Sequence, residues 1–136
     1  MDALPEGFAP HARKSPLTDP WEPIHAKVTA EAFILALRAG PQHTNSRGFV
    51  HGGLISALAD NAMGLSCGQA IGGGARLLTV SLSVDFVGVA AVGQWLAVET
   101  AFVRPGKTLA FAQAFVTADG AICARANATF RVVRAA

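Results

Sequence analysis

The sequence predicts an α+β fold in which an antiparallel β-sheet wraps around one long central helix. Three observations support this prediction: a Pro-free segment of helical length, period-two strands after it, and a chain of 136 residues with room for one core. One helix cannot cover both faces of a flat sheet, but a strongly twisted sheet can curl around it and bury it.

The chain divides into an N-terminal arm and one domain. Residues 1–22 are rich in Pro and lack periodicity, which predicts an arm that either wraps the domain or frays. Residues 23–136 form the domain. Its first element spans 25–38, where Val28, Phe33 and Ile34 favour a strand over a helix.

The central helix is expected over residues 54–70, after a loop over 43–53. Its residues are apolar or small on nearly every side, so we expect its surroundings to bury it. The glycines at 72–74 follow a helix and precede a strand, which is the reverse of the order in a phosphate-binding loop. They indicate a flexible connector.

The strands after the helix predict an antiparallel meander. In the first strand, Val80, Leu82, Val84 and Phe86 would face one side, and Thr79, Ser81, Ser83 and Asp85 the other. Further strands are expected over 94–103 and 108–117, joined by a Pro-Gly turn. Asp119-Gly120 predicts a two-residue hairpin before a last strand, in which Ile122 and the alternate residues up to Val132 share one face.

Composition excludes several functional classes. Only 15% of residues are charged while 51% are hydrophobic, so we expect some surface to be buried against another copy of the chain. The net charge of +2 is dispersed, which argues against a nucleic-acid partner. Asp60 interrupts the longest apolar stretch, which argues against a membrane span. Cys67 and Cys123 lie in apolar segments with no signal peptide ahead of them, which predicts free thiols and a cytoplasmic protein.

Two catalytic motifs are rejected from their context. Residues 64–68 match the G-x-S-x-G nucleophile elbow, but the match lies late in a helix and all four histidines precede Ser66. No paired spacing of histidines or cysteines predicts a metal site. We therefore expect no metal.

Asp60 is the leading candidate for catalysis because it is the one ionised side chain in the expected helix. Burying an unpaired carboxylate costs several kcal/mol, so a functional reason is expected, as a general base or a nucleophile. The alternative is an exposed or arginine-paired structural aspartate. Gly52 and Gly53 at the helix start would offer unbonded N–H groups to a ligand carbonyl, although they would also suit a tight turn. His51 alone is more typical of a hydrogen-bonding scaffold.

Together these residues resemble the PaaI-type (phenylacetate-pathway) hotdog-fold thioesterases. The resemblance is carried by NSRGFVHGG at 45–53, LAD at 58–60, TVSL at 79–82 and GKTLAF at 106–111, and it covers about residues 23–133. It implies a sheet wrapped around the helix, dimers that pair into a homotetramer, and hydrolysis of an acyl-CoA thioester without a cofactor.

The resemblance also implies roles for individual residues. Asp60 would attack the thioester or activate water, and the Gly52 N–H would polarise the carbonyl. Asn45 would help to hold the water or thioester, Thr79 would orient the nucleophile, and His51 would support the loop. Weaker candidates for binding the phosphates of CoA are Arg47, Arg104 and Lys107.

Helix geometry predicts that two chains share the site. Gly52 and Asp60 are eight residues apart, which is about 12 Å along one helix at about 1.5 Å per residue. Both cannot reach one carbonyl, so we expect a homodimer with antiparallel helices and two shared sites.

The alternatives are a hotdog hydratase or dehydratase, which usually needs a histidine beside the acid, and a non-catalytic acyl-CoA-binding protein.

Overall fold

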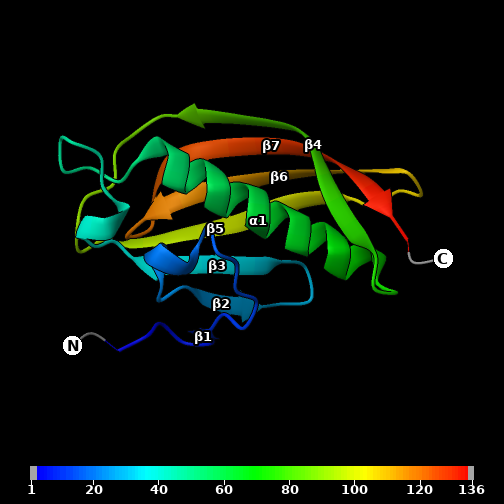
Figure 1. The fold of residues 1–136 in the computed structure, drawn as a ribbon, viewed down its shortest axis with the longest axis horizontal. Helices are drawn as coiled ribbons and strands as arrows, with labels where there is room; N and C mark the ends of the chain where they lie inside the picture. The colour runs from blue at the N-terminus through cyan, green and yellow to red at the C-terminus, as the bar shows by residue number, and fades with distance from the viewer. Residues whose placement is uncertain (1–2, 135–136) are drawn as a thin grey trace.

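The computed structural model describes residues 3–134 and shows an antiparallel seven-stranded sheet curled around one side of a long helix (Figure 1). The sheet order is β1-β2-β3-β5-β6-β7-β4. The elements are β1 (Ala9–Pro10), η1 (Asp19–Trp21), β2 (His25–Val28), β3 (Phe33–Arg38), η2 (Pro41–His43), α1 (Gly52–Ile71), β4 (Arg76–Phe86), β5 (Trp95–Arg104), β6 (Leu109–Ala118) and β7 (Ala121–Val133). The predicted fold class is confirmed.

The core lies between α1 and the inner face of the sheet. Leu58, Ala59, Ala62 and Met63 of α1 are fully buried there. The facing positions of β6 and β7 are mostly alanines, whose small side chains let the helix approach the sheet closely. No helix within residues 3–134 has both the length and the apolar character of a membrane crossing.

The helix is enclosed on one side only, which corrects the expectation that it would be buried all round. Gly53, Asn61 and Gln69 are exposed, and Asp60 is half-buried. The curled sheet covers one side of the helix, and the described residues provide no second layer over the other side (Figure 1). The uncovered face is therefore open to a second chain.

The order of the strands differs from the predicted meander. β5, β6 and β7 do form consecutive hairpins, but β4 pairs with β7 at the edge of the sheet, and β5 pairs with β3. The connection over residues 87–94 is too long for a hairpin turn. It passes the end of the sheet, held by hydrogen bonds from Val50 N–H to the Ala90 carbonyl and from Gly93 N–H to the Ala39 carbonyl.

The first predicted strand is in fact a hairpin. β2 and β3 pair with each other, and the chain reverses between Thr29 and Ala32. The Thr29 hydroxyl oxygen accepts hydrogen bonds from the N–H groups of Glu31 and Ala32, so this side chain stabilises a turn inside an apparently continuous strand pattern. Of the two alternatives for the arm, the structure shows the one in which it lies on the domain: β1 extends the sheet beside β2.

The two predicted turns are confirmed. Asp119 and Gly120 both have positive φ, 49° and 85°, as a two-residue hairpin requires, and they join Ala118 to Ala121. Gly106 lies in the β5–β6 turn, where any β-carbon would overlap the carbonyl oxygen of Leu109. Only glycine fits at that position.

A β-bulge in β4 reverses the predicted orientation of Thr79. Thr79 is opposite Phe130, which is buried against the helix, whereas Ser81 is opposite Thr129 on the outer face. Two residues that would share a face in a regular strand therefore point to opposite faces, because Val80 is the extra residue of the bulge. Thr79 faces α1 rather than the outside.

The packing of α1 against the sheet predicts that truncating Leu58 lowers the stability of the fold substantially. We expect Leu58→Ala to lower the free energy of unfolding by about 2–5 kcal/mol, because it opens a cavity at a fully buried position. The matched control is Leu4→Ala in the arm, which is 41% exposed and should change stability by less than about 0.5 kcal/mol. Urea unfolding measures both, and equal costs would contradict this packing.

Candidate active site

A hydrogen bond joins Asp60 to Thr79. The Thr79 hydroxyl donates to Oδ1 of Asp60 at 2.7 Å, linking the middle of α1 to β4. No other hydrogen bond in residues 3–134 engages this carboxylate. Asp60 lies at the edge of the uncovered helix face, so Oδ2 remains available to a ligand or a water molecule.

Of the two glycine N–H groups expected to be free at the start of α1, only that of Gly52 is free in the described part of the chain. His51 is the N-cap, and its Nδ1 accepts a hydrogen bond of 2.7 Å from the Gly53 N–H. The expectation that Gly53 would offer an unbonded N–H is therefore wrong, because the preceding side chain caps it. Among the described residues no acceptor engages the Gly52 N–H, which is at the first position of the helix.

Asn45 organises the loop that leads to this helix start. Its Oδ1 accepts hydrogen bonds from the N–H groups of Arg47 and Phe49, at 2.9 and 3.2 Å, and its own N–H donates to the Phe49 carbonyl at 2.7 Å. Gly48 completes the turn with a φ of 84°. Within one chain Asn45 is thus bound to its own loop and makes no hydrogen bond to Asp60.

The three basic candidates for phosphate binding are exposed and lie at two ends of the molecule. Arg47 precedes α1, whereas Arg104 and Lys107 flank the β5–β6 turn, which lies beyond the other end of the helix (Figure 1). A helix of 20 residues spans about 30 Å, so the two groups do not meet within one chain.

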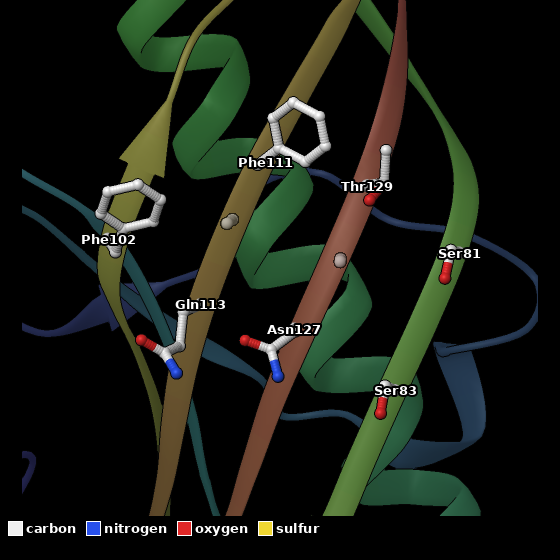
Figure 2. A pocket seen from close by; sticks show the side chains of 9 residues that line it. Ser81, Ser83, Phe102, Phe111, Gln113, Asn127 and Thr129 are labelled. Atoms are coloured by element: carbon white, nitrogen blue, oxygen red, sulfur yellow. The ribbon is translucent and has the colours of Figure 1, made fainter.

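A cavity on the sheet and a cavity at the helix start bear on the site. One, of about 320 Å³, is on the outer face of the sheet, where Phe102, Phe111, Gln113, Asn127 and Thr129 surround it (Figure 2). None of its lining side chains is titratable, so it offers no general base. The other cavity, of about 470 Å³, adjoins His51 and Gly53 at the start of α1 and is the one beside the candidate chemistry.

Neither Ser66 nor the cysteines provide a nucleophile. Ser66 is buried, and its hydroxyl accepts a hydrogen bond of 3.0 Å from the Phe33 N–H of β3, which fixes the helix to the sheet. Burial raises the pKa of the Cys67 thiol to about 11, and burial also raises the pKa of Cys123. Both thiols are free and buried.

Sequence reasoning missed two contributors to the surroundings of the site. One is the bulge at Val80, which turns Thr79 toward Asp60 and leaves no trace in the alternating pattern. The other is the arm, whose Leu17 and Trp21 line the cavity at the helix start. The signal in the sequence was the presence of two large apolar residues, a leucine and a tryptophan, in an otherwise polar and Pro-rich arm.

Comparison with known proteins gives a consistent family. Residues 47–124 match the family described as the thioesterase superfamily. The chain is 38% identical over 133 residues to the "Putative esterase PA0474" of Pseudomonas aeruginosa, covering 97% of this chain and 99% of that protein. It is 31% identical over 100 residues to human "Acyl-coenzyme A thioesterase 13", covering 71% of this chain and 69% of the relative.

Solved structures share the fold. A mutant of the phenylacetic acid degradation protein PaaI of Thermus thermophilus superposes with a TM-score of 0.76 at 20% identity, covering 89% of this chain and all of that one. The structure of smu.793 from Streptococcus mutans UA159, which is bound to acetyl CoA, has a TM-score of 0.70 at 25% identity over 76% of this chain and 82% of its own.

Burial of both cysteines predicts masked thiols. With a pKa of about 11, only about one Cys67 in a thousand is a thiolate at pH 8. We expect Ellman's reagent at pH 8 to react with the native protein at least about 100-fold more slowly than with the urea-unfolded chain. In the unfolded chain both cysteine thiols should react. Rapid stoichiometric labelling of the native protein would contradict the burial.

Proposed function

This chain belongs to the thioesterase superfamily and is a thioester hydrolase, and we propose that its substrate is an acyl-CoA and its working carboxylate Asp60. The observation that carries the proposal is the 2.7 Å hydrogen bond from Thr79, which orients a partly exposed carboxylate whose second oxygen has no partner in the described residues. A carboxylate held in this way is suited to general base or nucleophilic catalysis.

The proposed reaction uses two groups of the protein. Asp60 takes a proton from water as the water oxygen attacks the thioester carbon, or attacks that carbon itself to form an anhydride that water then hydrolyses. The Gly52 N–H binds the carbonyl oxygen, which gains negative charge in the tetrahedral intermediate. In both routes the carbon–sulfur bond breaks as this intermediate collapses, and the CoA thiolate leaves. In the second route this step forms the anhydride, and water hydrolyses it afterwards.

A second copy of the chain would bring these two groups together. Within residues 3–134, β4 is at the edge of the sheet and pairs on one side only. Gly52 lies beneath Phe86 at one end of β4, where an added β-carbon would be 3.1 Å from the ring, and Asp60 is bound to Thr79 near the other end. An antiparallel pairing of two β4 strands about an axis near Leu82 would place the Phe86 end of one chain beside the Thr79 end of its partner.

Exposed apolar residues around β4 support this interface. Seven of the fifteen large hydrophobic residues that are exposed in the described chain fall between positions 78 and 92, so the surface to be covered is concentrated there. An edge strand of eleven residues whose outer side has no partner in the described residues is also prone to pair with another chain. The tetramer implied by the family resemblance stays a prediction, which the native mass in solution tests.

The other proposed site residues fit supporting roles. Asn45 shapes the loop, and His51 caps the helix and so leaves Gly52 as the donor. Within one chain, His51 is the N-cap of α1, nine residues before Asp60, and its Nδ1 accepts the hydrogen bond from the Gly53 N–H, which fits a supporting role in the loop. Arg47 of one chain and the Arg104–Lys107 turn of another are proposed to meet the CoA phosphates, since antiparallel subunits bring opposite helix ends together.

Kinetics of Asp60 and Thr79 variants test the assignment. We expect Asp60→Asn to lower kcat by about 10²–10⁴-fold, because the amide keeps the volume but cannot accept the proton or attack. Thr79→Ala should lower kcat by roughly tenfold with KM changed less than about threefold, since orientation acts mainly in the transition state. Thr79→Ser should restore most of the loss. The assay is release of free thiol from a panel of aryl, short and long acyl-CoAs.

The matched control is Asp85→Asn. Asp85 is also a carboxylate of this region, but it pairs with Arg125 on the outer face at 2.9 Å, and its loss should leave turnover unchanged. Thermal unfolding of each variant checks that the fold is retained. Near wild-type turnover by a folded Asp60→Asn protein would remove Asp60 from the mechanism, and hydrolysis of no acyl-CoA by the wild type would refute the substrate class.

A further inference from the structure

The cavity at the start of α1 is built jointly by the helix and the N-terminal arm. Gly53, Leu54 and Ala57 provide the helix side, and Leu17 and Trp21 of the arm stand opposite them. The residues that match the thioesterase superfamily begin at 47, so this wall comes from a segment outside the matched region.

The arm is held firmly at this wall. His43 is buried, and its Nδ1 accepts a hydrogen bond from the Gly40 N–H, so its Nε2 carries the proton that is donated to the Trp21 carbonyl at 2.8 Å. Trp21 also packs against the core. A single buried side chain therefore links the arm to the loop before α1.

Leu17 is presented by a tight turn. The Ser15 carbonyl accepts hydrogen bonds from the N–H groups of Thr18 and Asp19, at 3.1 and 2.9 Å. The two hydroxyls of Ser15 and Thr18 are 3.0 Å apart and hydrogen-bonded. Leu17 projects from this turn and is 68% exposed, although it lines the cavity. Exposing a leucine to water on an ordered turn is unfavourable. Its position at the mouth of the cavity is explained if a bound ligand covers it.

The lining chemistry selects the kind of ligand. None of the nine lining residues is Lys, Arg, Asp or Glu, so the cavity has no permanently charged side chain for a phosphate or a charged acyl group. Leu17, Trp21, Leu54 and Ala57 are apolar. A volume of about 470 Å³ is within the range of small-molecule pockets and is ample for an alkyl or aryl chain.

We propose that this cavity binds the acyl chain of the thioester, and that Leu17 and Trp21 of the arm determine which chain lengths are accepted. This rests on the proposed function, because the rim of the cavity at His51 and Gly53 adjoins the Gly52 N–H to which we assign the carbonyl oxygen. A chain extending from that carbonyl along Leu54 and Ala57 would end against the arm.

Changing the volume of Leu17 tests the proposal. Leu17→Trp should fill the end of the cavity and lower kcat/KM for long or aryl acyl-CoAs by at least about tenfold, because even a methylene-sized misfit in an apolar pocket has an effect of that size. Leu17→Ala should lower the preference for chains that reach the arm by roughly threefold, because their contact is lost. Acetyl-CoA hydrolysis should change by less than about twofold in both variants, since an acetyl group does not reach Leu17.

The control is again Leu4→Ala, which removes the same atoms from an exposed arm leucine that does not line the cavity. Its chain-length profile should equal that of the wild type. A general effect of the arm on stability would lower kcat/KM for all substrates alike. The proposal instead requires a change in kcat/KM that grows with acyl-chain length.

Fluorescence gives a readout that needs no turnover. Trp95→Phe leaves Trp21 as the single tryptophan of the chain. Titration of this variant with free carboxylic acids should change the Trp21 emission saturably for the chain lengths that the wild-type protein prefers, and acetate should cause no change. In the Leu17→Trp protein, the same acids should compete more weakly with acyl-CoA hydrolysis, because their binding is weakened.

The outcomes separate the two proposals. If wild-type protein hydrolyses acyl-CoAs but every Leu17 variant keeps its chain-length profile, the acyl cavity is wrong and the proposed function stands. If wild-type protein releases thiol from no acyl-CoA, the proposed function fails and the acyl cavity fails with it.

Discussion

The hydrogen bond between Thr79 and Asp60 is the constraint on which the arrangement of the site depends. It crosses from β4 to α1, and it exists because one extra residue in β4 turns Thr79 toward the helix. Without the bulge, regular alternation would direct this hydroxyl to the outer face and leave the carboxylate without an orienting partner. The edge strand therefore both ends the sheet and determines which oxygen of Asp60 is free.

A single chain holds only part of the proposed site. The helix start offers the free N–H of Gly52, whereas His51 caps the N–H of the neighbouring Gly53. Asp60 lies about 12 Å further along the same helix. The uncovered face of α1, the unpaired edge of β4 and the exposed apolar residues after it all lie where a second copy would bring the two halves together. The arm adds a wall to the cavity beside Gly53, so specificity and chemistry are assigned to different segments.

Much of the fold was predictable because its signals are local. The length and apolar character of the helix, the Asp119-Gly120 turn and the alternation in β7 each depend on adjacent residues, and each was confirmed. The hairpin at Thr29, the position of β4 beyond β7 and the bulge at Val80 depend on pairing between distant segments, which no local pattern reports. Asp60 stood out as a lone ionised residue, whereas Leu17 resembled any exposed arm residue until the structure placed it at a cavity.

The sharing of one site by two chains is tested most directly by complementation between inactive subunits. Gly52→Pro removes the N–H, Gly52→Ala keeps it while adding the same β-carbon near Phe86, and Asp60→Asn removes the carboxylate. Gly52→Ala should remain active. Gly52→Pro and Asp60→Asn should each be inactive, but heterodimers purified through two different tags should recover about half of the wild-type rate, because one of two symmetric sites carries both lesions and the other neither. Verified heterodimers as inactive as their parents would contradict the shared site.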